Sequence, residues 1–204
     1  MIVADEQSSS EFREWVRQRT FVVAHEQLVE RGWDRVRVGQ IAEIVGVSRP
    51  TIYAEFGNKE GIAEALVLAE TNRFLIGVQE RLDRNFDDPE KALRAATRYT
   101  FAEAAKSPLL RAILTSSDEG NDTMLPLFTT RSEPIFLSAT QSLVEWYLRH
   151  YPNVDKARVT DAIDTLVRLT VSNLMFPGSR PSRAPSKIAD VAIVLLGEAL
   201  APAR

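Results

Sequence analysis

The chain has no cysteine among its 204 residues and only two histidines, His25 and His150. Without cysteine it cannot form disulfides, thiolate zinc sites or cysteine nucleophiles, and this composition is typical of a cytoplasmic protein. Neither histidine lies in a recognisable catalytic motif, and the sequence contains no phosphate-binding loop or nucleophile elbow. The sequence therefore does not favour an enzyme, and it predicts no metal site and no cofactor.

Long apolar runs and an excess of basic residues are also missing. No apolar run reaches the roughly 18 residues that span a bilayer, so we expect no contact with a membrane. Residues 1–10 are too polar for a signal peptide and are expected to form a flexible lead-in. Lys and Arg total 25 against 28 Asp and Glu, a net charge of −3. Any binding of nucleic acid must therefore depend on a small basic patch.

Residues 36–56, VRVGQIAEIVGVSRPTIYAEF, have the spacing of a helix-turn-helix. Ile41, Ile44 and Val45 recur at steps of three and four residues, which predicts one apolar face of a first helix. Gly46 follows where a helix commonly ends in a residue with positive φ. The pattern predicts an amphipathic helix that ends in a tight turn.

The residues after this turn predict a second helix. Ser48 can cap it by accepting a backbone N–H, and Pro50 falls in its first turn, where a missing N–H has no effect. Ile52 and Phe56 supply its inner face, so residues such as Arg49 are left facing outward.

In a helix-turn-helix the second helix enters the major groove of DNA, and its first residues reach the base edges. Arg49 can bond guanine and Thr51 can offer a hydroxyl or a methyl group, whereas Tyr53 and Lys59 are better placed for phosphates. The residues expected to contact DNA are Arg37, Ser48, Arg49, Pro50, Thr51, Tyr53 and Lys59. The alternative is a helix-turn-helix that binds no DNA, in which these charges are simply solvated.

Gly32-Trp33 followed by IAEIVGVSRPTIYAEFGNKEGI at residues 41–62 resembles the DNA-binding domain of the TetR (tetracycline repressor) family, over about the first third of the chain. The resemblance implies an all-α, homodimeric repressor that a small molecule releases from its operator. The chain departs from the family pattern at Val36 and Arg37, where Thr or Ser is usual. Gly39 weakens the first motif helix by roughly 1 kcal/mol relative to alanine. Glu55 is expected either to avoid phosphates or to accept from a cytosine amino group.

Helical periodicity continues through the rest of the chain, and no segment predicts a strand. A helix over residues 11–31 is expected to brace the motif through Phe12, Trp15, Val16, Phe21, Val22 and Leu28. Further helices are predicted over residues 58–82, 89–106, 108–114, 133–150, 155–176 and 185–200. We expect a DNA-binding domain over residues 11–66 and a helical effector-binding and dimerisation domain over residues 67–204.

The last two predicted helices have apolar faces wider than a single core requires. In the resembled family the corresponding pair packs against its twin, so we expect a homodimer through residues 155–176 and 185–200. Such a dimer would read an inverted repeat with half-sites about 34 Å apart. The alternative is that both are ordinary buried helices of one chain.

The middle of the body is rich in aromatic and leucine side chains, and the family resemblance places a ligand cavity there. The candidate lining residues are Tyr99, Leu110, Leu114, Phe128, Phe136, Gln141 and Asn173. This composition favours a small hydrophobic effector. Two alternatives stay open: the aromatic residues are plain core, or the protein is a DNA-binding helical dimer that acts constitutively or answers to a protein partner.

Overall fold

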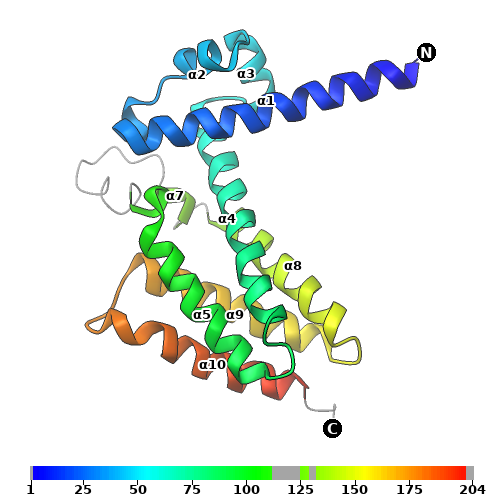
Figure 1. Cartoon of the computed structure of the whole chain (residues 1–204), viewed down its shortest axis with the longest axis vertical. Coiled ribbons are helices and arrows are strands. Elements are labelled where there is room, and N and C mark those ends of the chain that lie inside the picture. The colour runs from blue at the N-terminus through cyan, green and yellow to red at the C-terminus, as the bar shows by residue number, and fades with distance from the viewer. Residues whose placement is uncertain (1, 112–124, 129–131, 201–204) are drawn as a thin grey trace. The chain divides into compact units, whose positions relative to one another are not determined.

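The computed structural model describes residues 2–111, 125–128 and 132–200, and within these ranges every regular element is helical (Figure 1). This confirms the all-α prediction. The elements are α1 (Ile2–Arg31), the 3₁₀ helix η1 (Trp33–Arg35), α2 (Val38–Val45), α3 (Arg49–Phe56), α4 (Lys59–Asp83), α5 (Pro89–Lys106), α7 (Leu125–Phe128), α8 (Glu133–His150), α9 (Lys156–Met175), the 3₁₀ helix η2 (Pro181–Arg183) and α10 (Ala184–Leu200). None of the helices so described is long and apolar enough to cross a membrane.

The described residues form two compact units. The first comprises those within 1–69 and 108–127, and the second those within 70–107 and 128–204. Helix α4 contributes residues to both units. The predicted helix over residues 108–114 is present at 108–111, and its remainder lies outside the described residues.

Helix α1 differs from its prediction at its start, because it begins at Ile2 and not at residue 11 after a flexible lead-in. Residues 2–10 contain neither glycine nor proline, so nothing in them interrupts the helical hydrogen bonds. The end of α1 is as predicted. Gly32 has φ 77° and its N–H donates to Leu28 O at 2.9 Å.

The packing of α1 also corrects the prediction. Val16 and Leu28 are buried, but Phe12, Trp15 and Val22 are 50%, 46% and 47% exposed. A helix that packs on one side buries only the residues of one stripe, and these three lie on the opposite face. They therefore do not brace the motif.

Helix α2 buries Val38, Ile41, Ala42 and Val45. Ile44 is 55% exposed, so its assignment to this face was wrong. At about 100° per residue, Ile44 stands about 110° from the centre of the buried face. Helices α2 and α3 are the two helices of the motif, and both pack on α1 (Figure 1). Helix α1 is therefore the support for the motif.

The second unit is a helical body. Helix α10 packs against α5 and α9, and α9 packs against α8 (Figure 1). Side-chain hydrogen bonds join α4 to α8. Among them, Trp146 Nε1 donates to Asp83 Oδ1 at 2.8 Å, and Gln79 Nε2 donates to Ser142 Oγ at 3.0 Å. The bounds of α8, α9 and α10 lie within one residue of those predicted.

Candidate nucleic-acid interface

The turn between α2 and α3 has the geometry predicted from its sequence. Gly46 adopts φ 82° and ψ 29°, and its N–H donates to Ala42 O at 2.9 Å. The N–H of Val47 donates to the same carbonyl at 3.0 Å. These bonds close the end of α2 in a left-handed turn, which glycine adopts without steric strain.

Ser48 caps α3, as predicted, because its Oγ accepts from Thr51 N at 3.2 Å. The same Oγ lies 2.8 Å from Thr51 Oγ1, so the two hydroxyl groups share one hydrogen bond. Pro50 stands in the first turn and is exposed. The first turn of α3 is therefore fixed, and it presents two hydroxyl groups and an apolar ring.

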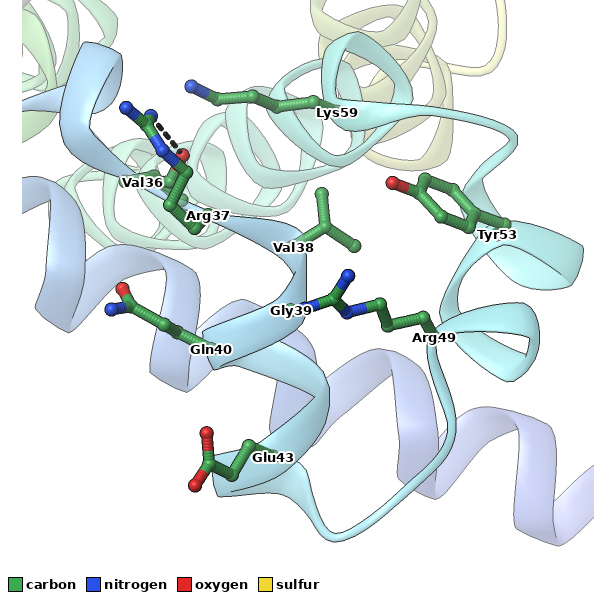
Figure 2. A pocket seen from close by; sticks show the side chains of 9 residues that line it. All are labelled: Val36, Arg37, Val38, Gly39, Gln40, Glu43, Arg49, Tyr53 and Lys59. Carbon is green, nitrogen blue, oxygen red and sulfur yellow. Dashed lines mark hydrogen bonds between the residues drawn. The ribbon is translucent and has the colours of Figure 1, made fainter.

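Arg49 is exposed at the start of α3, and its guanidinium group extends back over α2 (Figure 2). A Cβ on Gly39 would stand 2.7 Å from Arg49 Cζ, a distance that real contacts do not show. The absence of a side chain at residue 39 leaves room for this conformation of Arg49.

Arg37 and Lys59 are both held by the carbonyl groups around η1. Lys59 Nζ donates to Trp33 O at 2.9 Å, and Arg37 Nη1 donates to Asp34 O at 2.6 Å and to Val36 O at 3.2 Å. Burial of Lys59 and the neighbouring Arg37 charge lower the pKa of Lys59, in that order of size. The charges of Asp34 and Glu60 act in the opposite direction, but the pKa remains below its ordinary value. Two neighbouring cations whose hydrogen bonds go to neutral carbonyl groups favour a bound anion.

Helices α2 and α3 and the start of α4 enclose an open groove of about 530 Å³ (Figure 2). Its lining residues are Val36, Arg37, Val38, Gly39, Gln40, Glu43, Arg49, Tyr53 and Lys59. Three of these are cations and one is an anion. The groove thus brings together four of the seven residues predicted to contact DNA, Arg37, Arg49, Tyr53 and Lys59, while the other three lie on the first turn of α3.

Of the two roles expected for Glu55, the structure agrees with avoidance of phosphates and not with acceptance from a cytosine amino group. Its side chain is only 6% exposed and turns to α1, where Arg17 Nη1 donates to it at 2.7 Å and Arg13 Nε at 3.0 Å. Burial raises the pKa of Glu55, but the hydrogen bonds and charges of Arg17 and Arg13 outweigh burial, so the pKa lies below its ordinary value.

Arg13 and Arg17 were missed as positioning residues. Their spacing of four residues places them on one side of α1, which is a signal visible in the sequence. The sequence did not show that these arginines bind the Glu55 carboxylate, because the orientation of Glu55 depends on how α3 packs. The guanidinium of Arg17 also lies 5.6 Å from the centre of the Phe56 ring. Both arginines therefore fix α3 on α1.

The candidate ligand residues lie in several places. Tyr99 packs on α4, with its ring stacked 5.7 Å from Phe74 and under Arg81. The Phe136 ring lies under Arg168 at 4.8 Å, and Gln141 is exposed. Asn173 Nδ2 donates to Leu169 O, one turn back in α9, at 2.8 Å. Leu110 is half-buried in the first unit, whereas Leu114 and the Phe128 side chain lie outside the described residues.

Comparison with known proteins matches both parts of the chain. A family model described as "Bacterial regulatory proteins, tetR family" matches residues 21–66, and one described as "Bacterial Tetracyclin repressor, C-terminal domain" matches residues 88–193. The HTH-type transcriptional regulator AlkX of Mycobacterium tuberculosis is 30% identical over 150 residues, which span 74% of this chain and 70% of that protein.

Two solved structures have a similar fold. The TetR family repressor AlkX from a Dietzia strain, implicated in biodegradation of n-alkanes, has a TM-score of 0.77 and 24% identity over 89% of this chain and 97% of its own. Thermus thermophilus FadR, a TetR family transcriptional repressor in complex with lauroyl-CoA, has a TM-score of 0.59 and 19% identity over 92% of this chain and 96% of its own.

Proposed function

The chain belongs to the TetR family of bacterial DNA-binding transcriptional regulators, and we propose that it is a repressor that a small hydrophobic ligand releases from a palindromic operator. Its relatives are regulators and not enzymes. We further propose that residues 11–66 form the DNA-binding domain and residues 67–204 the effector-binding and dimerisation domain.

The observation that carries this proposal is the gathering of Arg37, Arg49 and Lys59 on one groove beside the start of α3. With an overall charge of −3, the protein as a whole does not attract DNA. The electrostatic attraction comes from the local excess of cations at this groove. Arg49 reads a base once its guanidinium leaves Gly39 and extends into the major groove. The Ser48 and Thr51 hydroxyls and the Pro50 ring approach the same groove of the DNA.

Lys59 and Arg37 hold a phosphate in this proposal. Two of the three ammonium protons of Lys59 have carbonyl acceptors, at 2.9 and 3.5 Å, which leaves a third proton for the DNA. A phosphate placed there offsets the repulsion between the two cations. Tyr53, which is 46% exposed on α3, donates its hydroxyl to an adjacent phosphate.

The proposed dimer uses α9 and α10. Leu166, Leu169 and Leu174 on α9 are only partly buried, and Val194 on α10 is 58% exposed. Large apolar side chains that one chain leaves uncovered on neighbouring helices favour a second copy over solvent. Two copies joined there present two α3 helices to an inverted repeat.

The nature of the ligand is proposed from the relatives. The Thermus protein binds lauroyl-CoA, and the Dietzia protein is implicated in n-alkane degradation. Lauroyl-CoA and n-alkanes both contain aliphatic chains, which suit the leucine-rich and aromatic body of this chain. The ligand tilts α4, which contributes to both units, and the α3 helices of the two copies lose their spacing. Ligand and operator then oppose each other through a coupling free energy of about 1 to 3 kcal/mol.

A gel-shift assay tests the proposal. The purified chain is incubated with the DNA that flanks its own gene, with random DNA as competitor and fixed salt, and a random-sequence selection follows if no shift occurs. We expect a specific shift on an inverted repeat, and release by fatty acyl compounds. Specific binding that none of these ligands releases would favour the alternative, a constitutive or partner-controlled DNA-binding dimer. No specific sequence in either experiment would contradict the regulator proposal.

A further inference from the structure

The outer face of α1 carries a stripe of exposed side chains at heptad spacing. The six residues alternate at steps of three and four, and all are exposed: Phe12, Trp15, Arg19, Val22, Glu26 and Val29. Phe12 and Trp15 stack on each other with ring centres 6.0 Å apart. A seam at this spacing is the pattern by which one helix packs along another. We call the six residues Phe12, Trp15, Arg19, Val22, Glu26 and Val29 the α1 stripe.

We propose that the α1 stripe is a self-association surface, on which a second copy of this chain packs its own α1 in the antiparallel direction. The contact lies in the first unit and is separate from the proposed dimer of α9 and α10. It does not depend on the proposed function.

The charges of the stripe select a second copy in the antiparallel direction. Arg19 precedes Val22 by three residues and Glu26 follows it by four, so a two-fold axis beside Val22 sets Arg19 of each copy next to Glu26 of the other. Within the part of the chain that the structure describes, neither residue has an ion pair. A parallel pair would instead set Arg19 against Arg19 and Glu26 against Glu26, which is repulsive.

The sizes of the apolar side chains are complementary in the same arrangement. Trp15 lies seven residues before Val22 and Val29 seven residues after it. The two-fold axis therefore places the large Trp15 ring of one copy against the small Val29 of the other at both ends, while Val22 meets Val22 in the middle. A large side chain opposite a small one is the arrangement that packs without voids.

The consequence for regulation rests on the proposed function. Two dimers joined through α1 would occupy neighbouring operators cooperatively, because the second dimer gains the α1 contact as well as its DNA contacts. Single operators would be bound without this gain.

Cysteine cross-linking tests the geometry, since the chain has no cysteine of its own. The full-length variants Val22→Cys and Val29→Cys each carry one thiol, at positions that are 47% and 52% exposed on the same face. In the antiparallel pair the two Val22 positions meet within the roughly 4.4–6.8 Å that a disulfide spans between Cα atoms. The two Val29 positions are about 21 Å apart along the helices.

Under mild oxidation without DNA, we expect a covalent dimer from Val22→Cys at least about tenfold faster than from Val29→Cys. Equal rates, or no cross-link from Val22→Cys, would overturn the proposal. Circular dichroism of both variants checks that α1 is intact.

Charge reversal gives an independent readout by sedimentation of the full chain. Arg19→Glu sets Glu against Glu and is expected to weaken association about tenfold or more, whereas Arg19→Glu combined with Glu26→Arg restores it. Association that is unchanged by the single reversal, or not restored by the double one, contradicts the antiparallel contact. All variants are expected to bind a single operator as the wild type does. If the wild-type protein itself binds no operator, that result counts against the proposed function and not against the α1 contact.

Discussion

The guanidinium group of Arg49, at the start of α3, rests over the backbone of Gly39 in α2 (Figure 2). The absence of a side chain at residue 39 thus makes room for the residue that is proposed to read a base. Gly39, a weak helix former in α2, and Arg49, an exposed residue of α3, therefore occupy one contact between the two helices.

Gly39→Ala is expected to raise the free energy of unfolding by up to about 1 kcal/mol, because alanine favours the helix and the displaced Arg49 end is flexible. Thermal or urea unfolding measures the change. The control is the same substitution in an Arg49→Ala background, where nothing has to move and the gain should be at least as large. A loss of stability in that background would show that residue 39 needs glycine for its backbone alone.

Glu55→Gln is expected to destabilise the protein by about 1 kcal/mol near neutral pH, since Arg13 and Arg17 lose their carboxylate. The folded-state pKa of Glu55 lies below the ordinary 4.5, so its contribution is present above that pH and disappears as pH falls through the folded-state pKa. The difference from wild type in urea unfolding should shrink below pH 4.5. Glu43→Gln, on the exposed side of α2, is the control. A difference that stays constant into acid would argue against the ion pairs.

Tyr147 makes the body sensitive to alkali. Burial, and secondarily the nearby Tyr151, raise the pKa of Tyr147 to about 12. The unfolded chain ionises this phenol near pH 10, so between pH 10 and 12 the folded state holds more protons and the free energy of unfolding falls as pH rises. Tyr147→Phe is expected to lessen that fall by at most about 1.4 kcal/mol per pH unit. Tyr53→Phe, at an exposed tyrosine, should leave the slope unchanged, and equal slopes for both variants would contradict the assignment.

Gln27 on α1 is 3% exposed, and both polar atoms of its amide have no hydrogen-bond partner in the ranges that the structure describes. A buried amide without partners opposes folding. Gln27→Leu is therefore expected to raise the free energy of unfolding by roughly 1 kcal/mol or more, whereas Gln18→Leu on the exposed side should change it by less than about 0.5 kcal/mol. Destabilisation by Gln27→Leu would mean that an ordered water satisfies the amide.

The sequence predicted well what local interactions decide. The turn at Gly46, the cap at Ser48 and the start of α5 after Asp88 depend on neighbouring residues, and all three are present. Which face of a helix is buried depends on distant residues. For that reason Ile44 was assigned to the wrong side of α2.

The same reason explains the errors at the candidate site. The side chain of Glu55 is exposed or buried according to how α3 packs on α1, and sequence spacing within α3 does not determine that. The position of Arg49 over Gly39 depends on how α2 and α3 cross, and the sequence motif does not predict this crossing geometry.

The groove beside α3 is proposed to bind DNA with separate residues for bases and phosphates. The most direct test of this proposal is fluorescence anisotropy of the full chain on its selected operator and on scrambled DNA across a salt series. Arg49→Ala should weaken operator binding by about 1 to 3 kcal/mol and scrambled binding far less, whereas Lys59→Ala should weaken both alike and reduce the salt slope by about one. Equal losses on both DNAs for Arg49→Ala, or an unchanged salt slope for Lys59→Ala, would contradict the account.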